Sequence, residues 1–298
     1  MPRLLVTHLT TYRYSEAVAF GPHRLMLRPR DSHELRLFSA TLTTSLPADL
    51  DWTYDVFGNV VCTASFNGMA DELSIESHLE IERFPSAVPT LFETGAGVPY
   101  PLAYSPDELA DLGACLAGAG EPFEPELEGW VHAILGEHSG GAMDLLRALC
   151  LEIHGSFAYE TRFEGIARSA AETFALRSGA CRDFAAFFIA VARRLGFGAR
   201  FVSGYLFDPP SVDGVGLQGV GATHAWAEIF LPGPGWVEFD PTNGLVASDR
   251  LIRVAVAREA YQAMPISGSF VGTPSAFAGL WVGVNVESIE PAPRSEAA

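Results

Sequence analysis

The first third of the chain alternates apolar and polar residues in short runs, the pattern of half-buried strands. Five such runs follow one another: Leu4–Tyr14, Leu35–Thr44, Trp52–Tyr54, Val60–Cys62 and Leu73–Ile81. The turn residues of Asp55–Asn59 separate the third run from the fourth, which predicts a hairpin. Because turn signals recur and no helical period is present, we expect residues 1–90 to form a β-sandwich-like domain.

The pattern changes after a stretch rich in Pro and Gly, residues 85–104. Apolar residues then recur every three or four positions, which indicates helices. A helix is predicted from Ser105, where Ser-Pro-Asp-Glu supplies a cap, and others over Glu121–Glu137 and Asp144–His154. The strongest helical pattern is Cys181–Leu195, whose phenylalanines share one face.

Strand patterns return behind this helix, at Ala199–Leu206, His224–Leu231, Trp236–Asp240 and Trp281–Glu287. The chain is therefore predicted to belong to the α+β class. We expect four segments: a β-rich domain over 1–90, a linker with helices over 91–140, an α+β core over 141–290 and a disordered tail over 291–298.

Charge narrows the classes of partner. The chain has 36 acidic residues and 19 basic ones, all of them Arg, for a formal net charge of −17. No basic patch is evident, so neither a nucleic acid nor an anionic membrane surface is expected as a partner. The longest apolar run, Phe184–Ala192, is far below the ~20 residues of a membrane span. The apolar stretch within residues 1–8 is too short for a signal peptide. A cytoplasmic location is therefore expected.

One of the four cysteines stands out. Cys62, Cys115 and Cys150 show no metal-binding spacing with one another or with Cys181, so we expect no metal and no cofactor. Cys181 follows two small residues and begins the strongest predicted helix. The unpaired N–H groups of a first helical turn favour an anion, such as a thiolate or a developing oxyanion.

A histidine and an aspartate occupy one predicted hairpin. His224 and Asp240 lie directly opposite each other if the turn centres on Pro232, and a two-residue shift leaves them diagonal. In either register the carboxylate can accept a hydrogen bond from the imidazole. Taken singly, the three residues have structural explanations: a buried thiol, a packed strand histidine and a turn-forming aspartate. Taken together, Cys181, His224 and Asp240 supply the nucleophile, the base and the orienting acid of a cysteine active site.

Longer motifs surround these residues: Gly179–Phe184 (GACRDF), Arg194–Leu206 (RLGFGARFVSGYL), His224–Ile229 (HAWAEI) and Gly235–Gly244 (GWVEFDPTNG). In them the chain resembles the bacterial transglutaminase-like superfamily. The first third resembles the β-rich region that precedes that core, through His8–Tyr14, Leu25–Arg30 and Asp55–Asn59. The resemblance implies a papain-like core, in which the helix carrying the cysteine packs on an antiparallel sheet carrying the histidine and the aspartate.

The resemblance also implies roles: Cys181 as nucleophile, His224 as base and Asp240 as orienter. The expected reaction is cysteine-dependent acyl transfer on a peptide or protein amide through a thioester, most simply hydrolysis by a peptidase or amidase. Transfer to an amine, as in a transglutaminase, and a non-catalytic binding or scaffold role stay open. Candidates for contact with the substrate or its oxyanion are Ala180, Arg182, Tyr159 and Trp226. Arg182 either favours an anionic substrate group or points to solvent.

Overall fold

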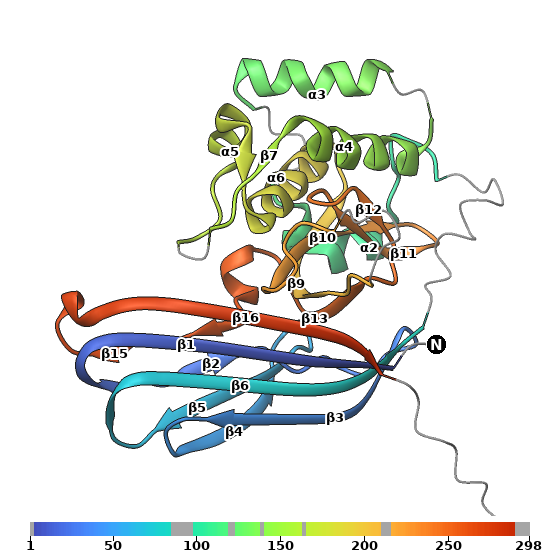
Figure 1. The fold of residues 1–298 in the computed structure, drawn as a ribbon. Helices are drawn as coiled ribbons and strands as arrows, with labels where there is room; N and C mark the ends of the chain where they lie inside the picture. Colours follow the sequence, from blue (N-terminus) through green and yellow to red (C-terminus); the bar gives the residue numbers. More distant parts are fainter. Residues whose placement is uncertain are drawn as a thin grey trace, which may run out of the picture.

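The computed structural model describes residues 3–84, 98–118, 123–137, 140–162, 165–209 and 216–289. In this part of the chain, two β-sheets form a sandwich, and a third sheet carries the helices (Figure 1). The predicted α+β class, with a β-rich domain ahead of a helix-bearing core, is confirmed. The predicted disordered tail and residues 91–97, 119–122 and 138–139 of the predicted linker segment lie outside the described residues.

The sandwich is built from the alternating strands of the sequence. Its first sheet has the order β15 (Phe270–Val271), β1 (Arg3–Phe20), β6 (Met69–Arg83) and β3 (Leu35–Thr44), with β16 (Phe277–Ile289) also pairing with β1. Its second sheet has the order β14 (Ile266–Ser267), β2 (His23–Leu25), β5 (Val60–Phe66) and β4 (Ala48–Tyr54). Alternate residues such as Leu73 and Ile75 are buried between the sheets, which is what the period of two requires.

The last strand returns to the first. β16 pairs antiparallel with β1 along most of its length, with Val286 opposite Val6 and Val282 opposite Thr10 (Figure 1). The predicted core range, residues 141–290, thus ends in a strand that belongs to the N-terminal sheet. Alternation within a strand indicates that it is a strand but not which strand it pairs with, so the sequence pattern did not reveal this return.

The core sheet is antiparallel, in the order β12 (Leu245–Val246), β11 (Gly235–Asp240), β10 (His224–Leu231), β9 (Gly198–Leu206) and β13 (Leu251–Ala257). Helix α6 (Cys181–Arg194) packs on β9 and β10. Its side chains Phe184, Phe187 and Phe188 are fully buried. The apolar face predicted from the sequence is thus the face that the helix turns toward the sheet.

Helices α4 (Ala142–Ser156) and α5 (Ala170–Leu176) pack on α6, and α3 (Pro125–Glu137) packs on α4. Helix α2 (Pro106–Leu112) contacts the 3₁₀ turn η1 (Gly113–Leu116), which packs on β9. The 3₁₀ turn η2 (Ala260–Ala263) packs on β9 and β13, and η3 (Pro274–Ala276) packs on β1 of the sandwich. Helix α2 begins behind Ser105, whose hydroxyl accepts a hydrogen bond from the Glu108 N–H, as its capping sequence predicts. The predicted start of the next helix at Glu121 lies outside the described residues. Among the described helices, none is long and apolar enough to cross a membrane.

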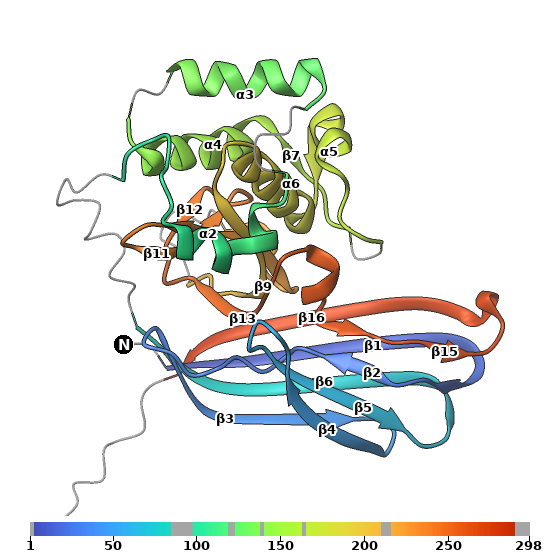
Figure 2. The ribbon, with the colours of Figure 1, turned by 180° about the vertical axis from the view of Figure 1, so that it is seen from behind.

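The sandwich packs directly against the core sheet (Figure 2). Leu4 and Val6 of β1 form one buried cluster with Tyr205 of β9 and with Ile252 and Val254 of β13. This apolar contact holds the first sheet of the sandwich beside the core.

Candidate active site

The first turn of α6 is held by a buried carboxylate. Asp183 is the third residue of the helix, and its Oδ2 accepts a hydrogen bond from the Ala180 N–H at 2.9 Å. This bond fixes the extended backbone that enters the helix at Cys181. The same bond engages the Ala180 N–H within the protein. Ala180 was a sequence-based candidate for holding the oxyanion, but its N–H is not free to do so.

Two further groups hold the same carboxylate. The Asp183 Oδ1 accepts from Arg162 Nη2 at 2.6 Å and from the Arg168 N–H at 2.8 Å. Burial alone would raise the pKa of Asp183, but these hydrogen bonds and the Arg162 charge outweigh it and lower the pKa. Asp183 is therefore ionised and ties Arg162 and Arg168 to the start of the helix. Sequence reasoning did not assign it a role, although it stands two residues from Cys181.

His224 and Asp240 meet across the β10–β11 hairpin. His224 Nε2 donates to Asp240 Oδ2 at 2.8 Å, and both side chains are buried. Ala227 is the Cα partner of Phe239, so the turn centres on Gly233 and not on Pro232. The two residues are therefore diagonal, the second of the two registers that the sequence allowed.

Charge stabilises this pair. Burial disfavours a protonated imidazole, but the charge and hydrogen bond of Asp240, with a contribution from Cys181, raise the pKa of His224 to about 10. Burial also disfavours the Asp240 carboxylate. His224 and the hydrogen bonds from Asn243 Nδ2 and the Thr242 N–H, both 2.9 Å, nevertheless lower the pKa of Asp240. At neutral pH the pair is an imidazolium and a carboxylate.

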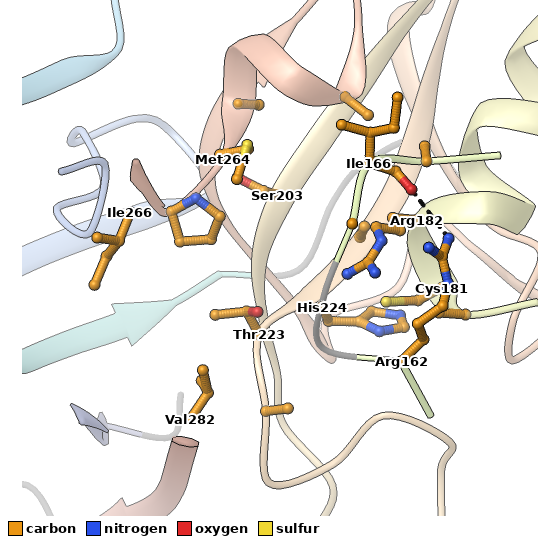
Figure 3. A pocket seen from close by; sticks show the side chains of 18 of the residues that line it. Arg162, Ile166, Cys181, Arg182, Ser203, Thr223, His224, Met264, Ile266 and Val282 are labelled. Atoms are coloured by element: carbon orange, nitrogen blue, oxygen red, sulfur yellow. Dashed lines mark hydrogen bonds between the residues drawn. The ribbon is translucent and has the colours of Figure 1, made fainter. Parts of the chain in front are cut away.

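Cys181 lies on the other side of the imidazole. Figure 3 shows its sulfur beside the His224 ring, at the edge of the cavity. The Nδ1 atom of His224 is buried and makes no hydrogen bond of standard geometry within the described residues. Such bonds are often long in a free enzyme and shorten when the substrate binds. The structure thus brings together Cys181, His224 and Asp240 from α6, β10 and β11.

Tyr159 lies close to Cys181. Its short strand β7 (Ala158–Tyr159) pairs in parallel with β8 (Ser178–Gly179), which makes Tyr159 the Cα partner of Gly179. Burial, followed by the charge of Cys181, raises the pKa of Tyr159 to about 12. The phenol is consequently a neutral hydrogen-bond donor at the edge of the cavity.

Trp226, a sequence-based candidate for contact with the substrate or its oxyanion, does not fit that role. Its indole N–H donates to Glu238 Oε1 at 3.2 Å, and the side chain is fully buried. The ring stacks near His224, with 6.0 Å between the centroids and 27° between the planes. Trp226 therefore supports the imidazole from behind and is not available to a substrate oxyanion.

Cys181 and His224 border a cavity of about 190 Å³, and Asp240 lies outside its lining. Cys181, Arg182 and Tyr159 lie on the core side, and residues of β1 and β16 form the opposite wall. Arg182 is about half-buried in this lining. None of the described lining residues is Asp or Glu, although the chain has 36 acids. Across the described ranges, no three His, Cys, Asp or Glu side chains are grouped to bind a metal ion.

Two family models and several known proteins match this chain. Residues 4–82 match the model of the bacterial transglutaminase-like N-terminal region, and residues 130–241 match that of the transglutaminase-like superfamily. An uncharacterized protein of Mycobacterium tuberculosis is 31% identical over 89% of this chain and 87% of its own length. One of Mycobacterium leprae is 26% identical over 91% and 94%.

A solved structure shares the fold. The crystal structure of a proposed cysteine protease from Cytophaga hutchinsonii superposes with a TM-score of 0.69, covering 98% of this chain and 92% of that one. The two sequences are 18% identical, so this likeness concerns the fold. It includes the sandwich as well as the helix-bearing core.

Proposed function

The chain belongs to the transglutaminase-like superfamily and carries its bacterial N-terminal region, and we propose that it is a cysteine-dependent amidase or peptidase. The observation that carries this proposal is the buried His224–Asp240 hydrogen bond of 2.8 Å beside a partly exposed Cys181 at a helix start. Desolvation makes a buried ion pair costly in free energy. Ionisable groups with strongly shifted pKa values beside a cavity are concentrated at functional sites, which supports a catalytic role for this pair.

In the proposed reaction, the Cys181 sulfur attacks the carbonyl carbon of an amide, with its proton held on His224. The C–N bond breaks as the Nδ1–H of His224 protonates the leaving amine, and a thioester remains. Water then attacks this thioester and gives a proton to His224. The C–S bond breaks, which releases a carboxylic acid and restores the sulfur. Asp240 keeps the imidazole in one orientation throughout.

The oxyanion formed in each step needs hydrogen-bond donors. We propose the N–H of Cys181, which stands in the first helical turn where backbone donors lack intrahelical partners, and the phenol of Tyr159. The N–H groups of Ala180 and Trp226 already donate to Asp183 and Glu238, which leaves them unavailable to an oxyanion and supports this choice. Removing one such donor costs about 10²–10³ in kcat in other enzymes.

Hydrolysis is favoured over amine transfer because a structure of the same fold is described as a proposed cysteine protease. Amine transfer uses the same thioester and differs only in the acceptor. Incubation of the protein with glutamine-containing peptides, with and without methylamine, separates the two outcomes by product mass. A free acid in both reactions supports a hydrolase, and a methylamide as the main product supports a transferase.

The nucleophile itself is tested by alkylation. Iodoacetamide at pH 7 is expected to modify Cys181 at least about tenfold faster than Cys115, a second partly exposed thiol whose pKa is raised by burial. The change Cys181→Ala should abolish turnover and leave the circular dichroism spectrum unchanged. Equal alkylation of the two thiols, or turnover by the alanine variant, would contradict an enzymatic role for Cys181.

A further inference from the structure

The sandwich supplies the far wall of the cavity. In the β1–β16 pair, Thr10 is the Cα partner of Val282, and Tyr12 is the partner of Leu280. All four residues line the cavity, so they form a continuous patch on one face of the sheet. This wall exists only because the last strand of the chain returns to the first.

Two other segments complete an apolar chamber. Met264 and Pro265 connect η2 to β14, which begins at Ile266. Ile166 lines the Cys181 side of the cavity, where its carbonyl oxygen accepts a hydrogen bond from Arg162 Nη2 at 3.1 Å (Figure 3). Figure 3 shows Met264, Ile266 and Val282 across the cavity from the Cys181–His224 pair. Both lining side chains present apolar surface that no described residue covers, since Ile166 is 75% exposed and Met264 40% exposed.

Among the described residues that line the sandwich side of the cavity, none is charged. His8 lines it, but its Nδ1 bonds the Tyr205 hydroxyl at 3.1 Å and its Nε2 bonds the Thr10 hydroxyl at 2.8 Å. Burial lowers the pKa of His8 to about 4, which keeps the imidazole neutral. The arginines of the lining, Arg162 and Arg182, come from the Cys181 side. A charged group bound at the sandwich wall meets no ionised partner among the described lining residues; the polar groups of the wall are the hydroxyls of Thr10 and Tyr12.

We propose that this wall is a specificity subsite that takes an apolar side chain, such as Leu or Phe, next to the reacting amide of a peptide. The inference rests on the proposed function, since it places the reacting amide at Cys181. A dry cavity of about 150 Å³ holds benzene in another protein, so 190 Å³ here suffices for one such side chain. A carboxylate at the same place would lose its water without gaining a cationic partner from the described residues of the wall.

The test uses the full chain and two series of blocked peptides, acetyl-Ala-X-Gln-Ala-Ala-amide and acetyl-Ala-Ala-Gln-X-Ala-amide, in which X is Leu, Phe or Asp. Two quantities are measured: kcat/KM, and the protection of Cys181 from iodoacetamide, which reports binding without turnover. In at least one series, Leu and Phe are expected to exceed Asp about tenfold in both quantities. Val282→Glu should reduce this preference to about twofold or less.

A neighbouring residue provides the matched control. Trp281 precedes Val282 in β16, is 56% exposed and is not part of the cavity lining. Trp281→Glu adds the same charge to the same strand and should keep the preference of the parent protein. Equal protection by the Leu, Phe and Asp peptides, or a preference that survives Val282→Glu, would overturn the subsite. Selective protection without any turnover would instead keep the subsite and refute the proposed reaction.

Discussion

Gly219 lies against the imidazole of His224: a methyl group placed on Gly219 would come within 2.9 Å of Nδ1. The loop that carries this glycine is tied to the hairpin, because the Gln218 N–H donates to Asn243 Oδ1 at 2.8 Å. Asn243 in turn donates to Asp240. The Gly219 backbone therefore covers the ring nitrogen that faces Cys181, and its position is coupled to the carboxylate behind the ring.

Gly219→Ala should reduce kcat/KM at least about tenfold, because the added methyl displaces the imidazole from its place beside Cys181. Gly221→Ala is the matched control. Both glycines have φ of +86°, but nothing lies within 4 Å of a methyl group on Gly221. Both changes should cost about 1–2 kcal/mol of stability through the left-handed backbone. Equal losses of activity in the two variants would show that backbone strain, and not contact with His224, is responsible.

Asp240→Asn should lower kcat by about 10²–10⁴, since the imidazolium loses the charge that sustains it. It should also change how stability depends on pH. In the parent, the pKa of His224 is raised from 6.5 to about 10, so its contribution to stability is complete below pH 6.5 and lost as pH rises to 10. Urea unfolding at pH 7 and pH 9.5 should show a smaller loss between these values in the variant. An unchanged loss would mean that Asp240 does not set the His224 pKa.

Asp183→Ala should destabilise the protein by about 2–4 kcal/mol, because it removes a buried acceptor from Arg162 and from the Ala180 N–H. The matched control is Glu172→Ala, which removes an acid from the same capping position of α5. Glu172 is exposed and should contribute far less. Urea unfolding measures both variants, and the rate of Cys181 alkylation should change in Asp183→Ala alone. Similar unfolding free energies would argue against a special role for Asp183.

Glu238→Gln should stabilise the protein at alkaline pH. Burial, together with the charge of Glu228, raises the pKa of Glu238 to about 8, although Arg83 and Arg253 oppose the shift. For an acid whose pKa is raised on folding, stability is greatest below the unfolded value of 4.5 and is lost as pH rises to 8. Glutamine keeps an acceptor for the Trp226 indole and cannot ionise.

The unfolding free energy of Glu238→Gln should therefore exceed that of the parent at pH 9 and match it within about 0.5 kcal/mol at pH 5. A variant that loses as much stability as the parent between these two values would exclude Glu238 as the titrating group.

Some features of this protein follow from the sequence because they depend on residues near each other in the chain. The apolar period of α6 fixes its buried face, and the helix start at Cys181 follows from that period and the small residues before it. The sixteen-residue spacing of His224 and Asp240 restricts them to neighbouring positions of one hairpin. The register stayed open by two residues because the turn, Pro-Gly-Pro-Gly, can centre on either of two positions.

Other features depend on contacts between distant segments, and only the tertiary structure decided them. The return of β16 to β1 joins the two ends of the chain, and no pattern within either strand names its partner. The partner of the Trp226 indole is Glu238, a choice made by the hairpin register. The cavity wall opposite Cys181 exists because the buried cluster of Leu4, Val6 and Tyr205 holds the sandwich against the core. The sequence by itself thus predicted which side chains meet at the site, whereas packing between distant strands decided which segments enclose it.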